Sequence, residues 1–281
     1  MTKTTLLLAA LLLFTGTLSA QDTKGVRPVN QPTNQPVNQT RAVVVGISDY
    51  QDAQIPDLKY ADRDAEAFAA WLRSPAGGAV SENNIQLLTN QNATHGKLVA
   101  ALGWLMEMSH ENDRAIIYFS GHGDVDTKLF GEPGFLLMWD TPAHMYMAGG
   151  YGLLYFQMVI TTLAVKNKVK VVVVTDACHA GKLASSDIGG TQITQANLAK
   201  QFANEVKILS CQPNEFSVES EQWGGGRGAF SFHLVEALHG LADADADQDI
   251  TLLELGRYLE DHVSKEVAPL EQTTMIVGNK K

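Results

Sequence analysis

Two short apolar runs rich in β-branched residues, at positions 115–119 and 171–175, constrain the fold of this chain most. Runs of this length, bounded by turn residues, predict strands that are buried on both faces of a parallel sheet. The first run is followed directly by Ser-Gly-His-Gly at positions 120–123, and the second by Asp-Ala-Cys-His-Ala-Gly at positions 176–181. The sequence therefore predicts a reactive side chain at the end of each of two buried strands.

His122 and Cys178 are those two side chains. In an open α/β sheet, catalytic groups gather at the carboxyl ends of the strands, so neighbouring strands would bring the imidazole and the thiol together. A cysteine thiol is mostly protonated at neutral pH, and an adjacent histidine activates it by taking its proton. The two motifs therefore favour a cysteine hydrolase.

Strand and helix patterns alternate along the rest of the chain. Helical patterns occupy residues 60–72, 94–108, 153–165, 229–239 and 251–263, further strands are expected at 42–47, 85–89 and 205–210, and an extended segment is expected at 134–139. This alternation predicts an α/β fold: a mostly parallel central sheet of about six strands, sandwiched by helices.

The first forty residues differ in composition from the rest. A signal peptide cleaved after Ala20 is predicted over residues 1–20, because Lys3 precedes an apolar stretch at 6–14 and small residues follow that stretch. The apolar stretch is too short to span a bilayer, so we expect an exported, periplasmic or extracellular protein without membrane attachment. Residues 21–40 form a Pro/Asn/Gln-rich linker, and residues 41–278 form the folded domain.

The charge of the chain argues against one class of partner. The formal net charge is −10 over 281 residues, and no run rich in lysine or arginine is present. A nucleic-acid-binding role is therefore not expected.

Cys178 has two alternatives to a catalytic role, a disulfide and a zinc site. Cys178 and Cys211 are the only cysteines, and a disulfide between them is the ordinary outcome in an exported protein. A glycine-flanked turn and a base elsewhere favour catalysis for Cys178, with Cys211 expected as a small buried residue. A zinc site of Cys178, His122, His144 and His179 lacks the paired ligand spacing that such sites use. His179 is also a weaker candidate for the base, because consecutive side chains in a turn diverge.

The strand-end motifs, about 50 residues apart, resemble those of the caspase-like cysteine peptidases. The resemblance extends to Arg-Ala-Val-Val-Val-Gly-Ile at 41–47 and Leu-Lys-Tyr-Ala-Asp-Arg-Asp-Ala at 58–65, and it covers residues 41 to about 277. The bacterial metacaspase-like subgroup is the most similar, since the flanks of Cys178 depart from the Gln-Ala and Arg-Gly of true caspases. The resemblance implies a caspase-like fold and endopeptidase activity on peptides or proteins.

The resemblance also assigns roles within the site. It implies an oxyanion hole made by the N–H groups of Gly123 and Cys178, and chemistry that requires no cofactor. It further implies an acidic pocket that accepts arginine or lysine, to which Asp64, Ser120 and Asp176 would contribute. The plainer alternative is that Asp64 and Asp176 only cap turns and helix termini. Self-cleavage is implied in the polar stretch 182–206, with Lys200 as the first choice.

An acidic segment near the end of the chain follows a different pattern. Its carboxylates occupy the calcium-ligand positions of an EF-hand loop, namely Asp243, Asp245, Asp247, Asp249 and Glu254. Gln248 replaces the usual glycine at the sixth position, which weakens such a loop. We expect a Ca²⁺ site, with a solvated acidic turn as the alternative.

Two further functional hypotheses remain open at this point. One is a catalytically silent, caspase-like domain that binds peptides as an adaptor. The other is a legumain-like or gingipain-like peptidase with the same dyad but a different specificity; Asp176 disfavours an asparagine preference and permits an arginine preference. The natural substrate and the oligomeric state lie beyond what the sequence determines.

Overall fold

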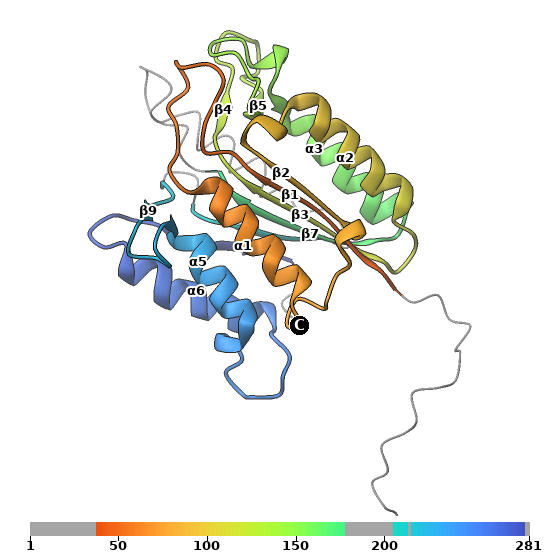
Figure 1. Ribbon diagram of the computed structural model, residues 1–281, viewed down its shortest axis with the longest axis vertical. Coiled ribbons are helices and arrows are strands. Elements are labelled where there is room, and N and C mark those ends of the chain that lie inside the picture. Colours follow the sequence, from red (N-terminus) through yellow and green to blue (C-terminus); the bar gives the residue numbers. More distant parts are fainter. Residues whose placement is uncertain (1–37, 178–204, 213–214, 279–281) are drawn as a thin grey trace, which may run out of the picture. The chain divides into compact units, whose positions relative to one another are not determined.

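A six-stranded sheet forms the centre of the folded unit (Figure 1). The computed structural model describes residues 38–177, 205–212 and 215–278, so the predicted signal peptide and most of the predicted linker lie outside the described residues. The strand order is β11-β8-β7-β3-β1-β2. The parallel strands are β1 (Thr40–Gly46), β2 (Ile85–Thr89), β3 (Arg114–Ser120), β7 (Lys170–Asp176) and β8 (Glu205–Leu209). The predicted mostly parallel sheet is confirmed.

The sixth strand, β11 (Met275–Val277), runs antiparallel to β8 at one edge of the sheet. It was not recognised in the sequence, because three half-buried residues give too short a pattern to separate from a loop. Two smaller sheets were also missed, apart from the extended segment at 134–139. They are formed by β4 (Gly123–Val125), β5 (Gly134–Leu136) and β6 (Tyr151–Gly152), and by β9 (Glu219–Ser220) and β10 (Arg227–Gly228).

Helices cover both faces of the central sheet (Figure 1). One face carries α1 (Ala61–Arg73), α5 (Ala229–Glu236) and α6 (Leu252–Glu266), and the other carries α2 (His95–Met108) and α3 (Leu153–Thr161). Short π-helical turns, Thr162–Lys166 and Ala237–Leu241, continue α3 and α5. Single 3-10 turns occupy Glu82–Asn84, Asn90–Asn92 and Tyr146–Ala148.

Successive side chains of the central strands pack alternately into two separate hydrophobic cores, one on each face of the sheet. In β1, Val43 and Val45 pack with α2 and α3, whereas Ala42 and Val44 pack with α1, α5 and α6. This alternation is what a strand buried on both faces requires, and it explains the uninterrupted apolar runs in the sequence. Each large side chain buried in this way contributes about 1.5–3 kcal/mol to folding.

Local sequence signals set where the helices begin. The Thr94 side chain accepts a hydrogen bond from the Lys97 N–H and so caps α2, as its position before the helical pattern predicts. Thr251 and Glu254 form a reciprocal capping box at the start of α6. Helix α1 lies close against the end of β1, because a Cβ at Gly46 would approach Ala61 O to 2.4 Å. This close approach brings the first turn of α1 to the carboxyl edge of the sheet.

No helix within the described ranges combines the length and the apolar character needed to cross a bilayer.

Candidate active site

The ends of β3 and β7 lie side by side, as the catalytic hypothesis requires. The two strands pair in parallel, with Ser120 opposite Asp176. Beyond the last pair, the Gly121 N–H donates to Asp176 O at 3.1 Å. His122 therefore follows β3 by two residues at the edge where β7 ends. Cys178 follows β7 by two residues in the sequence, but it lies outside the described residues, as do His179 and Lys200.

The imidazole of His122 is held in one orientation. The side chain is buried, and its Nε2 lies 2.7 Å from the carbonyl oxygen of Pro56. A carbonyl oxygen only accepts hydrogen bonds, so Nε2 carries the proton of the neutral ring and Nδ1 is the basic nitrogen. The His122 N–H donates to the Tyr50 hydroxyl at 2.8 Å, and the two rings lie 5.1 Å apart.

Gly123 presents a backbone donor beside His122. It pairs with Leu136 of β5, and the next hydrogen bond of this ladder runs from the Leu137 N–H to His122 O, at 2.9 Å. Because hydrogen-bonded and non-hydrogen-bonded pairs alternate in an antiparallel ladder, the Gly123 N–H points away from β5. A backbone N–H directed away from its own sheet is the type of group that stabilises an oxyanion.

The three residues expected in the acidic pocket do come together. Asp64 from α1, Ser120 from β3 and Asp176 from β7 line one small pocket, together with Glu219 and Gly228. Its volume is about 20 Å³, which is room for roughly one water molecule. Helix α1 begins without a side-chain cap, so Asp64 does not serve as the N-cap of that helix.

Asp64 has a partner that sequence reasoning missed. The Arg227 Nε donates to Asp64 Oδ1, and the Gly228 N–H donates to Asp64 Oδ2 at 3.0 Å. Burial raises the pKa of Asp64 to about 8, and the Arg227 guanidinium opposes this shift. No sequence pattern connects two residues so far apart in the chain; the contact arises because α1 and the segment before α5 meet at the sheet edge.

Only one carboxylate oxygen of Asp176 has a hydrogen-bond partner among the described residues. Its Oδ2 accepts a hydrogen bond from Ser231 Oγ at 2.8 Å, and Ser231 Oγ lies 2.7 Å from the Tyr118 hydroxyl. Its Oδ1 is buried and has no hydrogen-bond partner among the described residues. The backbone of Gly228 lies between the two carboxylates, because a Cβ there would be 2.9 Å from Asp64 Oδ2 and 3.0 Å from Asp176 Oδ2.

Cys211 corrects one expectation. It is buried just beyond β8, and it is disulfide-bonded rather than a small buried residue with a free thiol. The Ser210 N–H donates to Thr175 O at 3.0 Å, so Cys211 follows β8 at the same sheet edge at which β7 ends. Sequence spacing alone could not reveal that the chain returns to this edge at Cys211.

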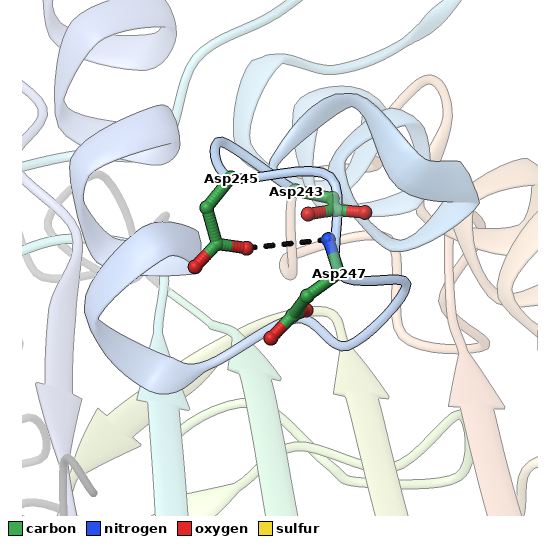
Figure 2. Close-up of side chains that lie close together, drawn as sticks. All are labelled: Asp243, Asp245 and Asp247. Carbon is green, nitrogen blue, oxygen red and sulfur yellow. Dashed lines mark hydrogen bonds between the residues drawn. The ribbon is translucent and has the colours of Figure 1, made fainter.

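The acidic loop before α6 gathers part of the expected calcium set (Figure 2). Carboxylate oxygens of Asp243, Asp245 and Asp247 lie within 4.8 Å of one another. Gln248 has a φ of 73°, the left-handed conformation that this loop position requires, and its N–H donates to Asp243 Oδ2 at 3.0 Å.

Two of the five expected calcium ligands stand apart from this group. Asp249 and Glu254 do not belong to it. The Glu254 carboxylate instead accepts hydrogen bonds from the N–H groups of Ala244 and Thr251. His122 and His144, from the zinc alternative, form no group of possible ligands within the described part of the chain.

Comparison with known proteins decides the family. A family model described as the caspase domain matches residues 39–280. The chain belongs to the caspase domain family. Caspase-domain proteins are cysteine peptidases, which supports proteins as the class of substrate. The resemblance inferred from the strand-end motifs is confirmed at the level of this family.

Solved structures support the same fold. The crystal structure of a Geobacter sulfurreducens protein matches with a TM-score of 0.58 and 18% identity, over 85% of this chain and 92% of that one. Caspase-1 from Spodoptera frugiperda matches with a TM-score of 0.57 and 13% identity, over 86% of each chain. At these identities the match establishes the caspase-like fold alone. Among curated proteins, none matches this sequence.

Proposed function

We propose that this caspase-domain protein is an exported cysteine endopeptidase in which Cys178 is the nucleophile and His122 is the general base and acid. One observation carries the proposal. The pairing of Ser120 with Asp176 puts the ends of β3 and β7 side by side, so that His122 lies at the edge where β7 ends, with Nδ1 as its basic nitrogen because Pro56 O accepts the Nε2–H. A nucleophile two residues beyond Asp176 would then have a base of fixed tautomer beside it.

The reaction follows from these groups. The Cys178 thiol gives its proton to His122 Nδ1, and the thiolate sulfur attacks the carbonyl carbon of the scissile peptide bond. The oxygen that takes up the electron pair is stabilised by the N–H groups of Gly123 and Cys178. The imidazolium then protonates the leaving nitrogen as the C–N bond breaks. Water, deprotonated by the same imidazole, hydrolyses the thioester and releases the thiol.

We propose that the residue before the cleaved bond is arginine or lysine. The support is the acidic pocket beside the strand ends, where Asp176 Oδ1 is buried and has no hydrogen-bond partner among the described residues. A guanidinium or an ammonium group would supply the missing donor and balance the charge.

The proposed function also includes a stabilising Ca²⁺ site and cleavage of the chain by its own activity. The grouping of Asp243, Asp245 and Asp247, and the left-handed Gln248, favour a Ca²⁺ site that stabilises the fold without joining the chemistry. Residues 182–206 are polar, and Lys200 is the basic residue at which we expect self-cleavage.

Covalent trapping tests the dyad. A short peptide chloromethyl ketone ending in arginine should alkylate Cys178, located by mass spectrometry of the digested protein under reducing conditions. His122→Ala should slow this labelling by at least about 100-fold, whereas His110→Ala, a change at an exposed histidine, serves as the matched control. Labelling at Cys211 instead of Cys178, or equal rates in the His122 variant, would contradict the proposal.

A further inference from the structure

Three charged side chains line the acidic pocket beside the strand ends, and a fourth pairs with one of them. Asp64 and Asp176 line the pocket, and the Arg227 guanidinium, which is not a lining group, pairs with Asp64. Glu219 also lines the pocket, but its carboxylate already accepts hydrogen bonds from the N–H groups of Lys59 and Tyr60. The charge that a ligand meets therefore depends on how Arg227 is shared between the two aspartates.

Arg227 forms its ion pair with Asp64. The side chains of Arg227 and Asp64 are 12% and 3% exposed, and the Arg227 Nε contacts Oδ1 directly. The other carboxylate oxygen of Asp64 is occupied by the Gly228 N–H. Arg227 Nη2 lies 3.4 Å from Ser231 O, which anchors the guanidinium from a second side. Both oxygens of Asp64 thus have donors from within the chain.

Asp176 differs from Asp64 in this respect. The residue is 7% exposed, its Oδ2 is held by Ser231, and its buried Oδ1 has no hydrogen-bond partner among the described residues. A buried carboxylate oxygen without a donor is costly, so a ligand that brings an N–H to this point is favoured.

We propose that Arg227 is a specificity-determining residue: it holds Asp64 in an internal ion pair and leaves Asp176 as the carboxylate that receives the cation of the substrate. This inference rests on the proposed peptidase function and deepens it. Above the raised pKa of Asp64, where its carboxylate is ionised, Arg227 balances Asp64, and Asp176 is the one carboxylate left to match one arginine or lysine side chain. Asp64 then acts by neutralising Arg227 and makes no contact with the substrate.

This division of roles predicts a rescue. Asp64→Asn alone would leave the Arg227 charge facing Asp176, and the preference for arginine over its neutral isostere citrulline should fall by about 30-fold or more. Removing both charges in Asp64→Asn/Arg227→Gln restores the single negative charge, so the preference should return to within a few-fold of the wild-type value. Arg63 also lies near this segment, with Nη1 3.4 Å from Gly225 O, but it does not pair with Asp64. Asp64→Asn/Arg63→Gln is therefore the matched control and should not be rescued.

Two readouts separate this inference from the proposed function. The first is the ratio of kcat/KM for peptides that end in arginine or citrulline. The second is binding of N-acetylarginine amide and N-acetylcitrulline amide to the same variants in a Cys178→Ala background, followed by NMR titration, which needs no catalysis. If the wild type cleaves no peptide but the binding preference follows the expected pattern, the proposed function fails and the inference stands.

Two results would overturn the inference. If Asp64→Asn/Arg227→Gln loses the arginine preference as completely as Asp64→Asn, then Asp64 binds the cation itself. A wild-type pocket that binds neither amide also overturns it. Should Asp64→Asn fail to fold, as its melting curve would reveal, the double variant is compared directly with the wild type. Retention of the preference supports the inference and its loss contradicts it.

Discussion

Nε2 of His122 lies 2.7 Å from the carbonyl oxygen of Pro56, a residue of the loop between β1 and α1. The loop thereby fixes the tautomer of an imidazole that follows β3, the strand next to β1 in the sheet, although Pro56 and His122 are far apart in the sequence. Because this carbonyl accepts the Nε2–H, Nδ1 is the basic nitrogen of an imidazole that lies just beyond β3, at the edge where β7 ends. The geometry of the proposed dyad therefore depends on three separate segments.

The first prediction concerns His122. His122→Ala should lower kcat/KM for the best peptide substrate by about 10²–10⁴-fold, because the proton carrier for both steps is lost. The thermal unfolding midpoint is measured beside the kinetics, with His110→Ala as the control. A His122 variant that is folded and hydrolyses the substrate at close to the wild-type rate would remove His122 from the mechanism.

The second prediction concerns redox state. Cys211 is disulfide-bonded, and Cys178 is the only other cysteine in the sequence. An intrachain disulfide of Cys211 would consume the thiol that we propose as the nucleophile. We expect oxidised protein to gain activity on addition of dithiothreitol, and Cys211→Ser to be active without it. Oxidised wild type with no titratable thiol and full activity would show that catalysis does not use Cys178.

The third prediction concerns calcium. A Ca²⁺ ion that binds only the folded state adds about 2.7 kcal/mol to the free energy of unfolding when its concentration is a hundred times Kd. The melting temperature should therefore rise by several degrees in millimolar calcium. A chelator should reverse this rise. Asp243→Asn and Asp245→Asn should weaken the effect, whereas Asp261→Asn, in the exposed pair with Lys265, should not. A melting temperature that does not respond to calcium would leave the loop as a solvated acidic turn.

The fourth prediction concerns self-cleavage. Wild-type protein kept under reducing conditions should yield two fragments whose masses place a cut after Lys200, because an enzyme that prefers basic residues would find Lys200 within a polar stretch. Cys178→Ala protein, purified in parallel, should stay intact. Lys200→Gln should block the cut without blocking cleavage of an added peptide if processing is not required for activity. Identical intact masses in wild type and Cys178→Ala would exclude this step.

The sequence predicted the central strands and helices well because their signals are local. Runs such as 171–175 are apolar throughout, and helices such as α1 carry a clear apolar stripe. It also predicted that His122 and Asp176 lie at the same edge, since parallel strands share a carboxyl end. The family resemblance supplied Asp64, which no periodicity could have placed there.

The features that were missed depend on contacts between distant segments. Arg227 meets Asp64 only after α1 and α5 have packed on the same face of the sheet, and Pro56 meets His122 only once the β1–α1 loop is folded. A single sequence holds no signal for such pairs. The disulfide of Cys211 differs, because two cysteines in an exported protein offered it as an alternative, but the glycine-flanked turn at Cys178 favoured a free thiol.

A panel of fluorogenic peptides measures both the dependence on Cys178 and the preference for arginine or lysine. Peptides that differ only in the residue before the cleaved bond, with arginine, lysine, aspartate or asparagine there, are offered to reduced wild type and to Cys178→Ala in the presence of calcium. We expect arginine and lysine peptides to be cleaved far faster than the other two, and Asp176→Asn to abolish most of this preference. Cys178→Ala should cleave none of them. Efficient cleavage after aspartate with arginine peptides inert, or undiminished cleavage by Cys178→Ala, would contradict the proposed function.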